Sequence, residues 1–139
     1  MKKIKSYDEL QKIIKEEKQF MLYVSMKNCS ICHVDMPKIE KISEENNFVS
    51  YNLEASEVPE AVGQLSLFAV PVVILFYEGK EFHRQAKIID FEELNIELDK
   101  YQKNIRRKNS IKLKCKFICD TMTIVVRIDL KTYNYEIKV

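Results

Sequence analysis

Two cysteines separated by two residues, Cys29 and Cys32, are the pair in this chain best suited to do chemistry. An apolar run over residues 20–24 precedes them, and a helical pattern begins directly after them. At a helix N-terminus, unpaired backbone N–H groups and the positive end of the helix dipole favour a thiolate over a thiol. The second cysteine, one turn further on, is close enough to close a small disulfide ring. The spacing therefore predicts a redox-active dithiol.

Cys29 is the candidate nucleophile of this pair. As a thiolate it would attack a substrate disulfide, and Cys32 would then attack the resulting mixed disulfide and release the reduced substrate. Helix N-termini and Cys-x-x-Cys contexts lower a cysteine pKa from about 8.5 to as low as ~3.5. Lys27 and His33 would add positive charge nearby. Two ordinary buried cysteines are the plainer alternative.

A zinc site is a further alternative, because His33 directly follows Cys32. Structural zinc sites normally need four ligands, and a second Cys-x-x-Cys pair at finger-like spacing is absent from the sequence. His33 fits better as a partly exposed helix residue, and His83, alone in an expected strand, as a structural one. We therefore expect no metal and no other cofactor.

The elements that must position the dithiol follow from the hydrophobic pattern. Ser6 and Glu9 form a capping box that opens an amphipathic helix. The pattern predicts helices over residues 7–17, from 30 through Pro37 to about 46, over 57–65 and over 91–103, and strands over 19–26, 48–53, 72–77 and 81–86. The order α-β-α-β-α-β-β-α predicts an α/β domain with a mixed central sheet flanked by helices.

The last part of the chain differs in charge from the rest. Residues 1–104 carry 14 Lys and Arg against 18 Asp and Glu, whereas residues 105–139 carry 9 against 3. We therefore expect a domain over residues 1–104 and a basic C-terminal extension over 105–139. Apolar and lysine residues alternate over 111–119, which predicts a half-buried strand and, with the residues that follow, two or three antiparallel strands.

Two more cysteines, Cys115 and Cys119, lie in this extension. On a strand they would share a face but lie ~13 Å apart, too far for a direct disulfide; on a helix they would also share a face. Small buried hydrophobic residues are the favoured interpretation. A regulatory or resolving disulfide with Cys29 or Cys32 is the alternative.

Composition limits the partners and the compartment. No apolar run approaches the ~18 residues of a membrane span, and Tyr7 and Asp8 stand where a signal peptide would be apolar. The expected compartment is the cytoplasm, and no membrane partner is expected. The basic residues 106–108, with the lysines at 112, 114 and 116, lack interleaved exposed aromatic residues, so no nucleic acid is expected. Lysines on an edge strand also block aggregation.

Four motifs accompany the expected order of the elements: Cys29-Ser-Ile-Cys32, Pro37 eight residues after the first cysteine, Val70-Pro71 before a strand, and the turn Glu78-Gly79-Lys80. On these motifs and that order of elements, the chain resembles the thioredoxin family over roughly residues 5–104. The resemblance implies a thioredoxin-like fold. It also implies that the bond before Pro71 is cis, that Pro71 packs against the dithiol, and that the backbone at Val70 pairs with a substrate strand.

The sequence departs from the family pattern at three places. Asn28 replaces the usual Trp, Ser30-Ile31 replaces the usual Gly-Pro, and Tyr23 stands where a buried acid is usual. Without that acid, deprotonation of Cys32 would need water or Cys29 itself as the base. We therefore expect slower resolution of the mixed disulfide than in a standard thioredoxin.

Two functions are compatible with this sequence. The first is a thiol-disulfide oxidoreductase that reduces protein or small-molecule disulfides through Cys29 and Cys32, binds substrate at Val70 and Pro71, and is itself reduced by a thioredoxin-reductase-like protein or a low-molecular-weight thiol. The second is a thioredoxin-fold module that binds peptides and has a vestigial dithiol.

Overall fold

The computed structural model describes the backbone of residues 1–121 and the side chains of residues 1–107. The chain divides into two units, Met1–Tyr101 and Gln102–Val139. The predicted domain boundary after residue 104 stays a prediction. The elements are β1 (Lys2–Ile4), α1 (Tyr7–Glu16), β2 (Gln19–Ser25), α2 (Ser30–Glu45), β3 (Val49–Glu54), α3 (Pro59–Gln64), β4 (Val72–Tyr77), β5 (Lys80–Ala86) and α4 (Phe91–Thr121).

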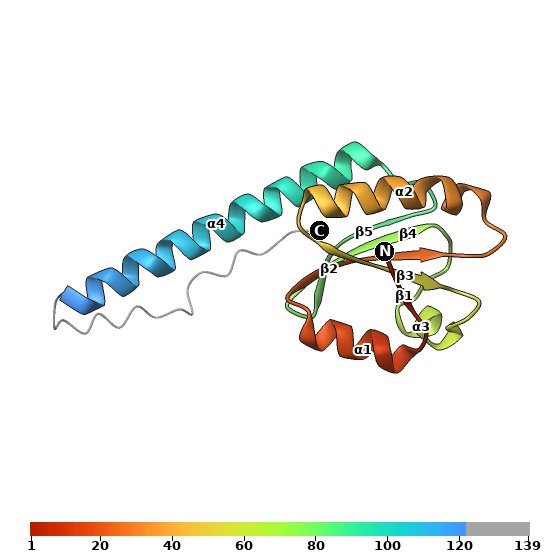
Figure 1. Ribbon diagram of the computed structural model, residues 1–139, viewed down its shortest axis with the longest axis horizontal. Coiled ribbons are helices and arrows are strands. Elements are labelled where there is room, and N and C mark those ends of the chain that lie inside the picture. The colour runs from red at the N-terminus through yellow and green to blue at the C-terminus, as the bar shows by residue number, and fades with distance from the viewer. Residues whose placement is uncertain (122–139) are drawn as a thin grey trace. The chain divides into compact units, whose positions relative to one another are not determined.

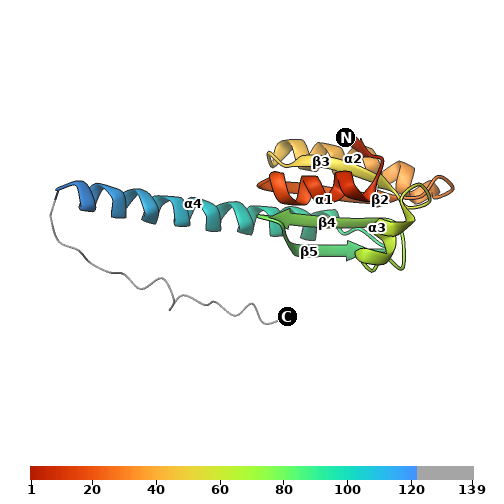
Figure 2. The ribbon, with the colours of Figure 1, turned by 90° about the horizontal axis from the view of Figure 1, so that it is seen from below.

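The first unit is built on one mixed sheet of five strands in the order β1-β3-β2-β4-β5. The strands β1, β3 and β2 are parallel, and β4 pairs antiparallel with both β2 and β5. Figure 2 shows the antiparallel arrows of β4 and β5 side by side. The mixed sheet flanked by helices confirms the predicted α/β class, since β2 and β3 are joined by a helical crossover.

Each face of the sheet is covered by its own helices (Figure 1). On one face, α1 and α3 bury Leu10, Ile13 and Ala61 against the side chains of β2 and β4. On the other face, Ile39 of α2 and Leu94 of α4 help form a second cluster. We call it the dithiol-side cluster, and its buried members are Met21, Tyr23, Cys32, Ile39, Ile42, Phe48, Val73, Leu75, Ile89, Leu94 and Leu98.

Local signals fix the ends of several elements. Ser6 caps α1 by accepting a hydrogen bond from the Glu9 amide at 3.2 Å, and the Glu9 carboxylate accepts one from the Lys5 amide at 2.8 Å. In the hairpin between β4 and β5, Glu78 and Gly79 have φ values of 47° and 77°. Two positive φ values in succession suit the twist of a tight hairpin, and glycine adopts them without strain.

The sequence pattern missed the first strand. β1 has three residues, Lys2 and Lys3 are exposed, and Ile4 is its one buried residue. Its partners in β3, Tyr51 to Leu53, lie far along the chain. So short an edge strand carries no apolar alternation of its own and forms because the sheet beside it is already in place.

The predicted strand over residues 111–119 is wrong, because α4 continues through this region to Thr121 instead of ending near residue 103. The sequence of this segment fits two periods: Ile111, Cys115 and Ile118 also recur at helical spacing. No Gly or Pro interrupts the chain after residue 79, so a helix begun at Phe91 can propagate. The strands predicted beyond residue 121 lie outside the described residues.

Candidate active site

The dithiol lies where β2 leads into α2, as predicted. Cys29 is the N-cap of α2, with extended backbone, and its Sγ accepts a hydrogen bond from the Cys32 amide at 3.2 Å. The two cysteines form a disulfide, with Sγ atoms 2.05 Å apart. Cys29 is partly exposed, whereas Cys32 is fully buried. Molecules in solvent can therefore approach Cys29, whereas Cys32 can react only with Cys29 or with a group already bound there.

A buried carboxylate holds the loop that leads into Cys29. Glu54, at the end of β3, is 6% exposed, and its Oε1 accepts hydrogen bonds from the Lys27 amide at 3.1 Å and the Ser56 hydroxyl at 2.8 Å. The Cys29 amide in turn donates to the carbonyl of Met26 at 3.0 Å. These bonds fix the backbone on both sides of Lys27, and so they fix the entry to the helix.

The two positive groups expected near the dithiol are both engaged elsewhere. The Lys27 ammonium lies 3.0 Å from a Glu57 carboxylate oxygen, and that hydrogen bond is the main cause of the raised pKa of Lys27. The His33 ring is exposed and donates from Nε2 to the Lys27 carbonyl at 2.9 Å. His33 therefore ties the first turn of α2 to the preceding loop, and the helix N-terminus supplies positive potential beside Cys29.

The segment before β4 carries the other two predicted site residues. The Val70–Pro71 peptide bond is cis, as the resemblance implied, and the Pro71 carbonyl accepts a hydrogen bond from the Lys87 amide at 2.9 Å. Val70 and Cys29 both pack against the dithiol-side cluster. Within the described part of the chain, the backbone N–H and C=O groups of Ala69 and Val70 make no hydrogen bond. This short stretch can therefore pair with another extended chain.

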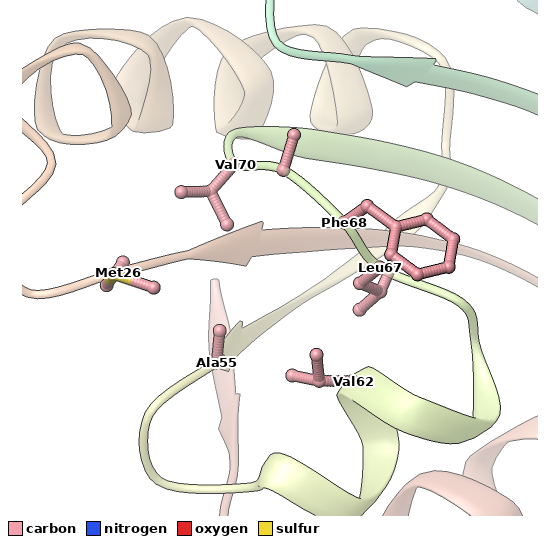
Figure 3. Close-up of a pocket in the computed structure, with 7 residues that line it drawn as sticks. Met26, Ala55, Val62, Leu67, Phe68 and Val70 are labelled. Atoms are coloured by element: carbon pink, nitrogen blue, oxygen red, sulfur yellow. The ribbon is translucent and has the colours of Figure 1, made fainter.

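An apolar pocket of about 300 Å³ adjoins this segment (Figure 3). In the figure, Met26 at the end of β2 and Phe68 stand on opposite sides of it. Its lining residues are apolar, namely Met26, Ala55, Val62, Leu67, Phe68, Ala69 and Val70. Phe68 is 94% exposed and Ile31, between the two cysteines, is 60% exposed. Large exposed apolar side chains such as these two are typical of a binding surface.

Two buried polar side chains, Tyr23 and Asp35, interact with each other, and Tyr23 contacts the dithiol segment. Tyr23 is fully buried, and its hydroxyl donates a hydrogen bond to the Cys32 carbonyl at 2.9 Å. Burial raises the pKa of Tyr23 above its usual range, and the nearby charge of Asp35 raises it further. Asp35, on α2, is 8% exposed. Position 23 on β2, where thioredoxins usually carry an acid, thus holds the neutral hydroxyl of Tyr23, and the buried carboxyl group of Asp35 lies on α2 instead.

Sequence reasoning did not single out Glu54, Asp35 or Phe68 as site residues. Asp35 follows Cys32 by three residues, and that helical spacing is a signal that places it on the buried face. Glu54 directly follows a predicted strand, where side chains of adjacent strands meet. Phe68 belongs to the irregular segment before Pro71, and no local pattern predicts its exposure.

The described residues form neither a cluster of metal ligands nor a membrane-spanning helix. Within residues 1–107, no three His, Cys, Asp or Glu side chains gather into a group that could hold a metal ion. Up to Thr121, the helices are too short or too polar for any of them to cross a membrane.

The sheet is mixed and five-stranded, its central strand leads into a helix that begins at a Cys-x-x-Cys disulfide, and a cis-proline precedes β4. These features define a thioredoxin-fold dithiol protein. The chain is 33% identical to the thioredoxin-like protein YdfQ of Bacillus subtilis over 90 residues, which are 64% of this chain and 80% of that relative. The chain belongs to the thioredoxin family. No protein-family model matches it.

Solved structures agree with this fold. Thioredoxin from Plasmodium falciparum matches with a TM-score of 0.66 at 20% identity, covering 73% of this chain and 99% of the other. A thioredoxin mutant from Halobacterium salinarum matches with a TM-score of 0.66 at 16% identity, covering 72% and 88%. At such identities, the structural likeness is evidence for the fold alone.

Proposed function

We propose that this protein is a thiol-disulfide oxidoreductase that reduces disulfides in protein substrates. The observation that carries the proposal is the asymmetry of the pair: Cys29 is partly exposed at the N-terminus of α2, and Cys32 is buried one turn behind it, within disulfide distance. In the reduced protein, the Cys29 thiolate attacks one sulfur of the substrate disulfide, and the other sulfur leaves as a thiolate. Cys32 then attacks Cys29, and the second substrate sulfur is released.

The surroundings of the pair support an extended protein segment as substrate. The unpaired backbone at Ala69 and Val70 offers main-chain hydrogen bonds, and Pro71 fixes the direction of the segment. The pocket beside it offers a place for one apolar side chain of the substrate. A thioredoxin-reductase-like protein or a low-molecular-weight thiol would return the Cys29–Cys32 disulfide to the dithiol.

The reactivity of Cys29 tests this proposal directly. We expect iodoacetamide to alkylate Cys29 in the reduced protein with an inflection well below pH 8.5, because the helix N-terminus stabilises the thiolate. Peptide mapping by mass spectrometry separates Cys29 from Cys115 and Cys119, and the unfolded protein is the control. An inflection near the unperturbed ~8.5 would count against the catalytic role.

A second prediction concerns the class of substrate. In the Phe68→Ala variant, we expect KM for reduction of insulin to rise about threefold to tenfold, because an apolar contact is worth roughly 1 kcal/mol. The rate of the same variant with the small disulfide 5,5′-dithiobis(2-nitrobenzoate) should stay unchanged. Equal effects on both substrates, or none on either, would contradict a role of this pocket in binding protein substrates.

The alternative of a binding module shares the pocket and the free backbone but makes no use of the dithiol. A module would bind the same extended peptide whether its cysteines are oxidised, reduced or changed to serine, and it would show no insulin reduction above the dithiothreitol background. The exposure of Cys29 favours the oxidoreductase, since a vestigial pair has no need of an accessible sulfur.

A further inference from the structure

Resolution of the mixed disulfide requires that the Cys32 thiol first lose its proton. Cys32 must be a thiolate to attack Cys29, yet Cys32 is fully buried and has no direct contact with bulk water. The side chain beneath it is Tyr23, whose hydroxyl is occupied in donating to the Cys32 carbonyl at 2.9 Å. Because burial and Asp35 raise the pKa of Tyr23, that hydroxyl stays protonated and accepts no proton at neutral pH.

Asp35 is the carboxylate best placed to take the proton. It follows Cys32 by three residues on α2, so the two side chains lie on one face with Cβ atoms about 5–6 Å apart. Both residues are buried, Asp35 being 8% exposed. At this separation, a carboxylate oxygen can reach a thiol directly or through one water molecule.

The surroundings of Asp35 keep its carboxylate available. Its Oδ1 lies 3.5 Å from the Nζ of Lys38, whose side chain is 54% exposed. Lys38 and Tyr23 are the charged or titratable side chains that interact with it among those the structure describes. The buried residues that β4 and α4 contribute to the dithiol-side cluster are apolar, namely Val73, Leu75, Leu94 and Leu98. An ion pair as long as 3.5 Å leaves lone pairs of the carboxylate free to accept.

We propose that Asp35 accepts the proton of the Cys32 thiol during resolution. The proton acceptor in this chain would then lie on α2, and not at the position of Tyr23 on the central strand β2. The proposal rests on the oxidoreductase function above. In this step the Cys32 S–H bond breaks and its proton passes to the Asp35 carboxylate. The Cys32 thiolate forms a bond with the Cys29 sulfur, the bond between Cys29 and the substrate breaks, and the substrate sulfur leaves with the electron pair. The proton on Asp35 then passes to the departing thiolate or to water.

The step can be isolated with 5,5′-dithiobis(2-nitrobenzoate) and stopped-flow absorbance. The reduced full-length chain is used with Cys115→Ser and Cys119→Ser, so that Cys29 and Cys32 are its two remaining thiols. Attack by Cys29 releases a first thionitrobenzoate, and attack by Cys32 on the mixed disulfide releases a second. The first phase reports the nucleophile, and the second phase reports resolution.

In Asp35→Asn, we expect an unchanged first phase and a second phase slowed about 100-fold at pH 7, the range for loss of a general base. The rate of the second phase should rise about tenfold per pH unit in Asp35→Asn, where hydroxide becomes the base, and much less steeply in the parent. Asp35→Glu should restore most of the rate. Lys38→Met keeps the carboxylate and should leave the second phase within a few-fold of the parent.

Several outcomes would overturn the proposal. One is an unchanged rate of the second phase in Asp35→Asn. Another is an equal slowing of both phases in that variant, which indicates a structural role. If Asp35→Asn does not fold, the pH profile of the parent still decides, because a tenfold rise per pH unit there excludes a buried base. A parent whose first phase is no faster than a free cysteine refutes the oxidoreductase function instead, which separates the two failures.

Discussion

Changing Cys29 to serine should abolish insulin reduction, leaving the rate at the dithiothreitol background. The hydroxyl of serine is a far weaker nucleophile than a thiolate at neutral pH, and Cys29 is the sulfur of the pair that solvent reaches. The measurement is the rate of insulin precipitation at fixed dithiothreitol. Cys115→Ser and Cys119→Ser together form the matched control and should keep the full rate, because the proposed chemistry uses neither of them.

The companion variant, Cys32→Ser, should give a different result that identifies the order of attack. Cys29 can still form the mixed disulfide, but no second sulfur is present to resolve it. We expect a covalent complex with substrate that is visible on a non-reducing gel and disappears when a reducing agent is added. A complex that forms with Cys29→Ser but not with Cys32→Ser would reverse the assigned roles.

Changing Phe20 to alanine should lower the free energy of unfolding by about 3–5 kcal/mol, the usual cost of emptying a buried aromatic site. Phe20 on β2 is fully buried, its ring stacks on Phe76 with centroids 4.6 Å apart, and it meets the Tyr51 ring edge-on at 5.8 Å. Three strands of the sheet therefore share this contact. Since domains of this size are stable by roughly 5–15 kcal/mol, the loss is a large share of the total.

Urea unfolding followed by circular dichroism measures this change. Phe68→Ala is the matched control, because it removes the same side chain from a position that is 94% exposed. We expect the control to stay within about 0.5 kcal/mol of the native protein. A loss below ~1 kcal/mol in Phe20→Ala would mean that the stacked rings contribute little to this core.

The sequence alone determined the features that rest on neighbouring residues. The apolar run of β2, the Cys-x-x-Cys pair and the helical spacing after it are contiguous, so they predicted the strand, the N-cap cysteine and the helix correctly. The strongly apolar β4 and the turn at Glu78 and Gly79 likewise predicted a hairpin. These interactions lie within a few residues of each other, so local preferences and their periodicity are enough to specify them.

Only the tertiary structure decided the remainder. β1 exists because β3 offers it a pairing edge, and α4 continues past residue 103 in a segment whose residues fit both a helical and a strand period. The burial of Glu54 and Asp35 depends on which elements pack over them, and the pocket joins residues from separate parts of the chain. Burial and cavities are properties of packed elements, and a carboxylate in a sequence looks the same whether it faces water or a buried thiol.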